Sequence, residues 1–475
     1  MSGFARGPVL GIGAAVSVVL VLLSGGYGYH RDELYFLAAG RHLAWGYPDQ
    51  PPLVPAVARA VWEVAPDSLV LLRLSSALIA GAVVVLAGLM AGRLGAQRGG
   101  QVLAAAATAL TGFVLAMGHL LSTSTYDLLG WTLITYLLLR LLQGDDARLW
   151  PVVGLVAGVT MLANVLVAFL LVGFAVSLLL VGPRRLLLSP GPWLGALLAA
   201  LLGLPYLVWQ ARHGWPQLEV AGNIASGGSG SSAPRLLLLP LLVLQVGPWL
   251  LPIWLTGLVR LWRDPALRSL ATTFGVLLVV FLVTGGKPYY LAGLVPLFLA
   301  AGAQPLLDRA RHAWKAPALL VLSLPAAVFV LPVVPPQSTE AIVAVNYDAG
   351  ETIGWPSFAR QVAAAYRDLP EGTAVLAGNY GEAGAVDRYG PDLGLPRAYS
   401  GHNGYAAWGA PPGATPVLAI GIDPALLDDL CAELRTVGHV ASAYGVDNDE
   451  DGTAMSYCVP AQPWSETWPR LTVLG

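Results

Sequence analysis

Long apolar runs recur through the first 334 residues and restrict what this chain can fold into. Runs of about 17 to 25 apolar residues are long enough to cross the hydrocarbon core of a bilayer as helices. Over the whole chain 56% of the residues are hydrophobic and only 11% are charged, whereas an average soluble protein is about 25% charged. The sequence therefore predicts a polytopic α-helical membrane protein.

The apolar runs predict about eleven spanning helices. Residues 150–181 are too long for one span and too short for two full ones. Because Asn164 interrupts this stretch, we predict two short helices that meet at the outer surface. The first run lacks an Ala-x-Ala cleavage site, which favours a retained span over a cleaved signal peptide. The other predicted spans cover residues 8–26, 69–91, 101–121, 126–142, 191–209, 236–260, 267–284, 288–303 and 316–334.

Lys and Arg are unequally divided between the loops that connect these runs. Through Val334, alternate loops place thirteen basic residues on one side and seven on the other. Cytoplasmic loops carry the excess of Lys and Arg, so the richer side is predicted to be cytoplasmic. The first loop (residues 27–68), the 210–235 loop and the residues after 334 then share the outer face. The Ser-Gly-rich run at residues 226–232 is predicted to be a flexible loop tip.

The chain changes character at Pro335. Before it, basic residues exceed acidic ones by nine; from it onward, acidic residues lead by eleven. Predicted strands and helices alternate in this C-terminal region (residues 335–475), which indicates a small extracytoplasmic α/β domain beside a membrane domain of residues 1–334. The predicted strands are 373–378, 416–422, 439–444 and 454–459, and the predicted helices are 358–367, 382–389 and 424–434.

The two cysteines, Cys431 and Cys458, both lie in the C-terminal region. In an oxidising compartment they can pair, and two independent thiols are an equal alternative. Nucleic acid is excluded as a partner, because no basic run or stripe is available to neutralise phosphates. The chain also lacks a phosphate-binding lysine loop, an HExxH motif and a serine nucleophile elbow.

An acidic pair, Asp32-Glu33, stands in the first loop, where periodicity predicts two amphipathic helices along the membrane surface. Placing acidic side chains at a membrane boundary costs free energy, so we treat the pair as candidate functional residues. Neighbouring helical residues point about 100° apart, and we predict that Asp32 faces a cavity as a general base. Glu33 is the second catalytic candidate, or it caps the helix or pairs with Arg31 or Arg41. The plain alternative is that both acids cap the helix.

Three further polar residues are candidates for substrate binding. Asp49 and Gln50 precede Pro51-Pro52, which fixes the backbone there, although Asp49 is also suited to cap a turn. Asp127 opens a predicted span, where Asp or the neighbouring hydroxyls can instead cap the helix. His119 lies just upstream and could join carboxylates around a metal, but a lone His is more often simply hydrogen-bonded.

Cations and aromatic residues mark other loops on the same predicted face. Lys287, followed closely by Tyr289 and Tyr290, is the only lysine on that side. An ammonium beside two tyrosines suits a lipid phosphate, and an interfacial lysine with an aromatic belt is the alternative. Arg212 is a second candidate for the phosphate. Trp215 is a candidate for sugar stacking or a membrane anchor.

The C-terminal region offers two candidate loops. Residues 378–382 follow a predicted strand and precede a predicted helix, where α/β folds place binding residues. The loop at residues 399–405 contains His402 and is glycine-rich and aromatic, as a loop that covers a ligand would be. Ordinary turns are the alternative interpretation of both segments.

Two motifs of the first loop, Arg31–Arg41 and Gly46–Pro52, resemble the first outer loop of the dolichyl-phosphate-mannose protein mannosyltransferase family. This superfamily includes the bacterial lipid A aminoarabinose transferase. The segments around Asp127, Lys287–Tyr290 and Asn379–Glu382 are similar to bacterial members. The resemblance covers most of the chain, and its first-loop motif is the most specific part.

This resemblance implies a C-type glycosyltransferase fold and a polyprenyl-phosphate-linked sugar as donor. It implies that Asp32 is the base and that Lys287 contacts the donor phosphate. Many relatives carry a lysine where this chain has Leu162–Val165. If that lysine touches the donor, Arg212 or Lys287 must do its work here.

We therefore expect an inverting sugar transfer to an acceptor hydroxyl on the outer face of the cytoplasmic membrane. The acceptor is a glycan, a lipid or a protein. No cofactor is required, although a divalent metal could share the phosphate. The alternative is a transporter or flippase of lipid-linked sugars, but the sequence shows no paired broken helices in matching halves.

Overall fold

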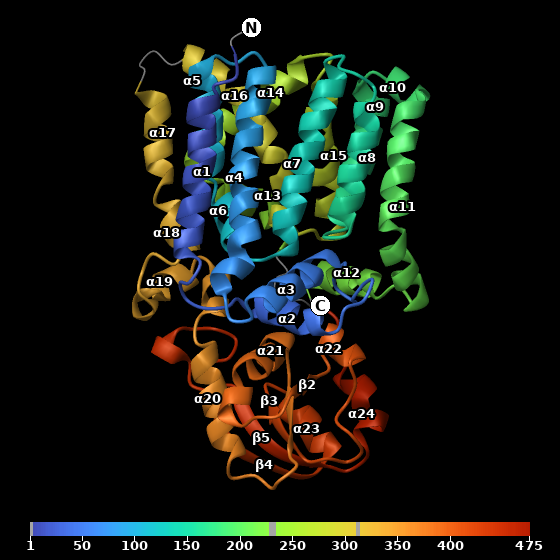
Figure 1. Ribbon diagram of the computed structural model, residues 1–475, viewed down its shortest axis with the longest axis vertical. Helices are drawn as coiled ribbons and strands as arrows, with labels where there is room; N and C mark the ends of the chain where they lie inside the picture. The colour runs from blue at the N-terminus through green and yellow to red at the C-terminus, as the bar shows by residue number, and fades with distance from the viewer. Residues whose placement is uncertain (1–2, 228–233, 310–313) are drawn as a thin grey trace.

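The computed structural model describes residues 3–227, 234–309 and 314–475. Figure 1 shows a bundle of long helices at one end, a layer of shorter helices across its base, and an α/β region beyond that layer. The N-terminus lies at the far end of the bundle from the α/β region. Most of the Ser-Gly-rich run at residues 226–232 lies outside the described residues.

The bundle is built from the predicted apolar runs. Its helices are α1 (Arg6–Leu23), α4 (Leu69–Arg93), α5 (Arg98–Ala109), α6 (Gly112–His119), α7 (Thr123–Leu142), α8 (Leu149–Met161), α9 (Leu166–Val181), α10 (Arg185–Leu188), α11 (Pro190–Arg212), α13 (Leu238–Val246), α14 (Leu251–Arg263), α15 (Arg268–Thr284), α16 (Val295–Arg309), α17 (Lys315–Ser323) and α18 (Ala326–Val330). Short 3-10 turns join them at η1 (Arg235–Leu237), η2 (Pro248–Leu250) and η3 (Pro288–Leu294).

The chain is a multi-pass membrane protein. Among the described residues, α1, α4, α11 and the segment Pro288–Arg309 are long and apolar enough to cross a bilayer. Two bent pairs raise the number from four to six if each pair is one span. Four shorter apolar segments occupy other predicted spans: α8, α9, α15 and Lys315–Val330. The count of about eleven stays a prediction.

Breaks in the bundle follow from local chemistry. The predicted interruption at Asn164 is confirmed, because α8 ends at Met161 and α9 begins at Leu166, whose N–H donates to the Asn164 Oδ1 atom at 3.0 Å. The segments on either side of Gly247-Pro248 meet at 86°. Gly247 has a φ of +108°, and Pro248 lacks the N–H that a continuous helix needs, so the helix bends there.

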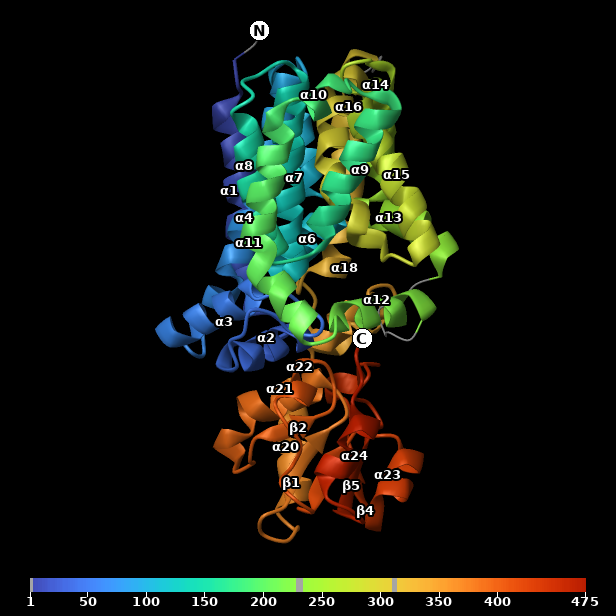
Figure 2. The same ribbon diagram turned by 90° about the vertical axis from the view of Figure 1, so that its right-hand side faces the viewer.

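Three helices lie across the base of the bundle, as Figures 1 and 2 show. They are α2 (Arg31–Arg41), α3 (Leu53–Val64) and α12 (Pro216–Ser226). Helices α2 and α3 are the two predicted in the first loop, and Pro52 caps α3 as the Pro51-Pro52 break implies. Helix α12 falls in a segment for which we predicted only a loop. Pro216 suits the first turn of this short helix, because that position needs no backbone N–H.

The C-terminal region contains a five-stranded sheet in the order β2-β1-β3-β5-β4. Strand β1 pairs in parallel with β2 and β3, and β5 pairs antiparallel with β3 and β4. The strands are β1 (Ala374–Ala377), β2 (Ala398–Ser400), β3 (Val417–Ile420), β4 (Cys431–His439) and β5 (Ala454–Pro460). The helices are η4 (Pro336–Ser338), α19 (Glu340–Val343), η5 (Tyr347–Thr352), α20 (Trp355–Tyr366), α21 (Tyr380–Tyr389), η6 (Pro391–Leu393), α22 (Gly404–Ala407), α23 (Pro424–Leu430), η7 (Ala443–Gly445) and α24 (Trp464–Leu471).

The C-terminal region differs from its prediction in several places. Strand β2 and the helices α19, α22 and α24 were not predicted. The helix predicted over residues 424–434 ends at Leu430, and the strand predicted over 439–444 is instead β4, which ends at His439. Strand β4 lies at the edge of the sheet and is largely exposed, so it lacks the alternating apolar pattern that marks a half-buried strand. A disulfide joins Cys431 to Cys458 between β4 and β5, which settles the pairing left open by the sequence.

The C-terminal region and the base of the bundle share one hydrophobic core. Leu34 and Tyr35 of α2 are buried in the same cluster as Trp355 of α20 and Ala383 of α21. Helix α21 approaches α2 closely at Gly384, where an added Cβ would lie 2.8 Å from the Leu34 Cβ. The start of α2 is therefore enclosed between the bundle and the C-terminal region.

Candidate functional site

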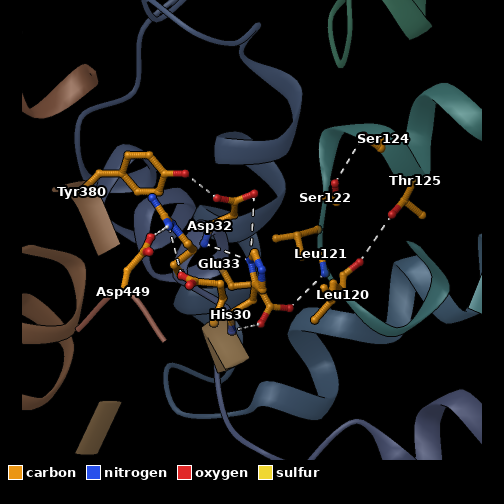
Figure 3. Close-up of polar contacts among 12 residues, drawn as sticks. His30, Asp32, Glu33, Leu120, Leu121, Ser122, Ser124, Thr125, Tyr380 and Asp449 are labelled. Atoms are coloured by element: carbon orange, nitrogen blue, oxygen red, sulfur yellow. Dashed lines mark hydrogen bonds and ion pairs between the residues drawn. The ribbon is translucent and has the colours of Figure 1, made fainter. Parts of the chain in front are cut away.

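The acidic pair stands in the first turn of α2, and a capping box fixes it there. The Nδ1 atom of His30 accepts a hydrogen bond from the Asp32 N–H, and the Glu33 Oε2 atom accepts one from the His30 N–H at 2.9 Å. Such reciprocal bonds satisfy N–H groups that a helix start leaves unpaired. The two carboxylates point in different directions, as Figure 3 shows.

Glu33 is completely buried and has no oxygen free for a substrate. Its carboxylate forms an ion pair with Arg73 of α4, at 2.9 Å to Nε and 2.7 Å to Nη2. The Leu121 N–H also donates to Oε1, at 2.9 Å. This geometry supports the alternative in which Glu33 caps the helix and pairs with a cation, and it argues against a catalytic role for Glu33. The cation that pairs with Glu33 is Arg73, not Arg31 or Arg41.

Asp32 is the accessible member of the pair, with 40% of its side chain exposed. The hydroxyl of Tyr380 in α21 donates a hydrogen bond to its Oδ1 atom at 2.8 Å (Figure 3). Its Oδ2 atom lies 3.9 Å from Nδ1 of His30. Asp32 therefore stands where α2 meets the C-terminal region, with an oxygen that can accept a proton.

Asp49 and Gln50 lie beneath a loop of the C-terminal region. The Tyr35 hydroxyl donates to Asp49 Oδ1 at 2.8 Å, and the Asn403 amide donates to Oδ2 at 3.4 Å. The Gly404 N–H in turn donates to the Tyr35 hydroxyl at 3.0 Å. Burial is the main cause that raises the pKa of Asp49 to about 7. Asp49 itself is partly exposed, whereas Gln50 is buried.

Asp127 lies in α7 and lines a small cavity with room for about one water molecule. Helix α7 is capped by the Ser122 hydroxyl, not by Asp127, because that hydroxyl accepts from the Ser124 N–H at 3.2 Å. Asp127 is buried, and its Oδ1 atom has no hydrogen-bond partner. The cavity is lined by Met117, Ser124, Asp127, Leu128, Leu166, Tyr289, Ala292 and Gly293.

Tyr289 connects this cavity with the acidic pair. Its side chain lines the cavity together with Ser124 and Asp127 and also interacts electrostatically with Asp32. Lys287 precedes it, half-buried at the N-terminus of η3, and interacts electrostatically with Tyr290. The structure therefore places the predicted acids, the lysine and the tyrosines at the same end of the bundle.

The remaining predicted residues have different surroundings. Arg212 is exposed on the last turn of α11, and Trp215 is partly exposed just before α12. Neither makes a described contact with Asp32 or Lys287. His402 lies nearer the acidic pair, with its ring 4.8 Å from that of Tyr380. Its Nε2 atom lies 2.9 Å from the Gly475 carbonyl oxygen, and burial lowers its pKa.

His119 does not join the acids, because its Nε2 atom lies 3.3 Å from Nη1 of Arg73. Within the described ranges, no three His, Cys, Asp or Glu side chains converge as a metal ion would require.

Arg73 was not singled out from the sequence, and Tyr380 was singled out only as part of the candidate loop at residues 378–382. Arg73 stands in the predicted span 69–91, and a lone arginine near the end of an apolar run is itself a signal for a buried acidic partner. Tyr380 follows β1 at the point where α21 begins, which is a favoured position for binding residues, but its partner Asp32 is 348 residues away.

These features define a polytopic membrane protein with a C-type glycosyltransferase fold. Its architecture is similar to ArnT from Cupriavidus metallidurans in the apo state, with a TM-score of 0.61 and 14% sequence identity. ArnT bound to undecaprenyl phosphate, from the same organism, matches with a TM-score of 0.57 and 17% identity. Each alignment covers 94% of this chain and 97% of the other.

Comparison of the sequence with family models agrees with the structural similarity. The family model of the dolichyl-phosphate-mannose-protein mannosyltransferases matches residues 49–209, whereas no curated protein sequence matches the chain. The predicted resemblance to the superfamily of protein mannosyltransferases and lipid A aminoarabinose transferases is thereby confirmed.

Proposed function

We propose that this protein is a membrane glycosyltransferase that moves a sugar from a polyprenyl phosphate to an acceptor hydroxyl. The family match and the ArnT-like fold support this class of enzyme. One ArnT structure holds undecaprenyl phosphate, which supports a donor of that chemistry. The observation that carries the proposal is Asp32, a partly exposed carboxylate held at the same end of the bundle as Asp127, Tyr289 and Lys287.

The proposed reaction is a single displacement. Asp32 takes the proton of the acceptor hydroxyl, and the acceptor oxygen forms a bond to the anomeric carbon. The bond from that carbon to the phosphate oxygen breaks on the opposite face, so the configuration inverts. The electron pair leaves with the polyprenyl phosphate. Lys287, with Arg212 as a second cation, offsets the negative charge that develops there.

The orientation is part of the proposal. Basic loops gather at the end of the bundle opposite α2, α3 and the C-terminal region (Figure 1), which favours a cytoplasmic location for that end. The disulfide between Cys431 and Cys458 favours an oxidising compartment for the C-terminal region. The reaction then takes place on the outer face of the cytoplasmic membrane.

The proposals for cofactor, acceptor and metal follow from this class of reaction. No cofactor is needed, because the lipid phosphate is already a leaving group. The acceptor is a glycan, lipid or protein hydroxyl, and a divalent metal is tested as an additional partner of the phosphate.

The test is product formation by purified protein from undecaprenyl-phosphate sugars and fractionated envelope acceptors. Asp32→Asn is expected to lower the rate by about 100-fold or more, because a general base contributes roughly 10²–10⁴-fold. Asp67→Asn is the matched control, since Asp67 is an exposed acid of the same loop that pairs with Arg388. A parallel assay with EDTA measures metal dependence.

Equal rates for wild type and Asp32→Asn would remove Asp32 from the role of base. Movement of the lipid-linked sugar across vesicles without any product would instead identify a flippase.

A further inference from the structure

Tyr380 is the residue of the C-terminal region that reaches the proposed base. It is the first residue of α21, and its hydroxyl donates to Asp32 Oδ1 at 2.8 Å (Figure 3). The hydroxyl belongs to a segment that the family match at residues 49–209 does not include. This contact links the C-terminal region to the chemistry proposed for the first loop.

A second capping box fixes the position of Tyr380. The Asn379 Oδ1 atom accepts from the Glu382 N–H at 2.9 Å, and the Glu382 Oε2 atom accepts from the Asn379 N–H at 3.1 Å. Glu382 Oε2 also accepts from the Gly378 N–H at 2.9 Å. Gly381 allows close docking, because an added Cβ would lie 3.0 Å from the Arg31 Cβ. The start of α21 is thus held against the start of α2.

Three side chains surround the Tyr380 ring. The Arg31 guanidinium lies 4.9 Å from the ring centre, and the rings of Tyr35 and His402 lie at 4.9 and 4.8 Å. Arg31 is itself held by Glu351 and Asp449, at 3.1 Å each. A phenol enclosed in this way loses little freedom when it donates its hydrogen bond, so the geometry is preorganised.

We propose that Tyr380 is a positioning residue that holds Oδ1 of Asp32, so that Oδ2 faces the acceptor hydroxyl. The C-terminal region then completes the active site instead of only covering it. This inference rests on the proposed function.

The test is Tyr380→Phe, which removes the hydroxyl and keeps the ring. We expect kcat to fall about tenfold with little change in the donor KM, because the base is no longer held in the orientation that the reaction needs. Tyr405→Phe is the matched control. Its hydroxyl donates to Asp387 at 3.0 Å, a similar tyrosine–carboxylate bond in the same region but with a different acid.

A second substitution covers the case in which Tyr380→Phe does not fold. Fluorotyrosine at position 380 keeps the ring and the hydroxyl but makes the phenol a stronger donor, so kcat should change while the donor KM stays the same. A change confined to kcat supports positioning. If neither variant changes kcat while Asp32→Asn abolishes transfer, the positioning role is wrong and the proposed function stands. If Asp32→Asn has the wild-type rate, the proposed function itself fails.

Discussion

Two neighbouring acids acquire different properties because helix geometry sends them to different surroundings. Glu33 enters a dry ion pair with Arg73, whereas Asp32 keeps 40% of its side chain exposed. Removing one partner of a buried ion pair costs about 3–5 kcal/mol, because the other charge is left without compensation. We infer that Glu33 joins α2 to α4 and that this anchor holds Asp32 in place. The sequence favoured Asp32 as the reactive acid, but it did not identify the partner of Glu33.

Glu450 gives a prediction at the scale of one residue. It is 4% exposed, neither carboxylate oxygen has a hydrogen-bond partner, and burial followed by the charges of Glu351 and Glu382 raises its pKa to about 8. Because the folded state holds this proton more tightly than the unfolded state, the contribution of Glu450 to stability is fully present below about pH 4.5 and is lost as the pH rises through about 8.

Glu450→Gln removes this titration while keeping the shape of the side chain. We expect the variant to be more stable than wild type at pH 7, by up to about 3 kcal/mol, and the difference to disappear near pH 4.5. The measurement is the thermal midpoint of the full chain in detergent across this pH range. Glu371→Gln changes an exposed acid of the same region and should leave the pH dependence as it is. A constant difference at every pH would contradict the prediction.

At the scale of elements, the contact between α2 and α21 decides how the site is assembled. Gly384 faces α2, and an added Cβ would lie 2.8 Å from the Leu34 Cβ and 3.0 Å from its backbone carbon. We expect Gly384→Ala to lower stability by about 1–3 kcal/mol, because backbone cannot move aside as easily as a flexible side chain. The thermal midpoint and the transfer rate, measured together, check this expectation.

Gly222→Ala in α12 is the matched control, because an added Cβ there has no atom within 4 Å. It is expected to keep the wild-type midpoint or raise it slightly, because alanine favours a helix more than glycine does. If the two alanine variants behave alike, the close approach of α21 to α2 is not important for stability.

Elements with strong local signals were predictable, and those defined by distant partners were not. The capping Asp423 and the following proline marked the start of α23 correctly. The end of that helix was missed, because the edge strand β4 forms through its pairing with β5 and carries no alternating pattern of its own. Helix α12 was missed because its segment lies beside a glycine-rich run that indicates a loop.

At the scale of the whole molecule, the bundle has one end rich in basic loops and another that carries the candidate site (Figure 1). If the C-terminal region is extracytoplasmic, a cysteine at Ser465 should react with a membrane-impermeant maleimide in intact cells. Ser465 is exposed in α24, and both native cysteines are in the disulfide.

A cysteine at Ala147 is the matched control. Ala147 is exposed in the loop between α7 and α8, at the opposite end of the bundle. It is expected to react only after the membrane is made permeable. Labelling of Ala147→Cys but not Ser465→Cys in intact cells would reverse the proposed orientation.

Hydropathy, charge placement and helix breakers are local properties, so the sequence by itself determined the membrane class, the amphipathic first loop and about half of the helices and strands of the C-terminal region. It also contained the motifs that carry the family resemblance. Only the tertiary structure decided that Glu33 pairs with Arg73 and that Tyr380 reaches Asp32 across 348 residues. Such contacts depend on which surfaces the whole chain brings together, and local sequence patterns contain no information about a partner so far away.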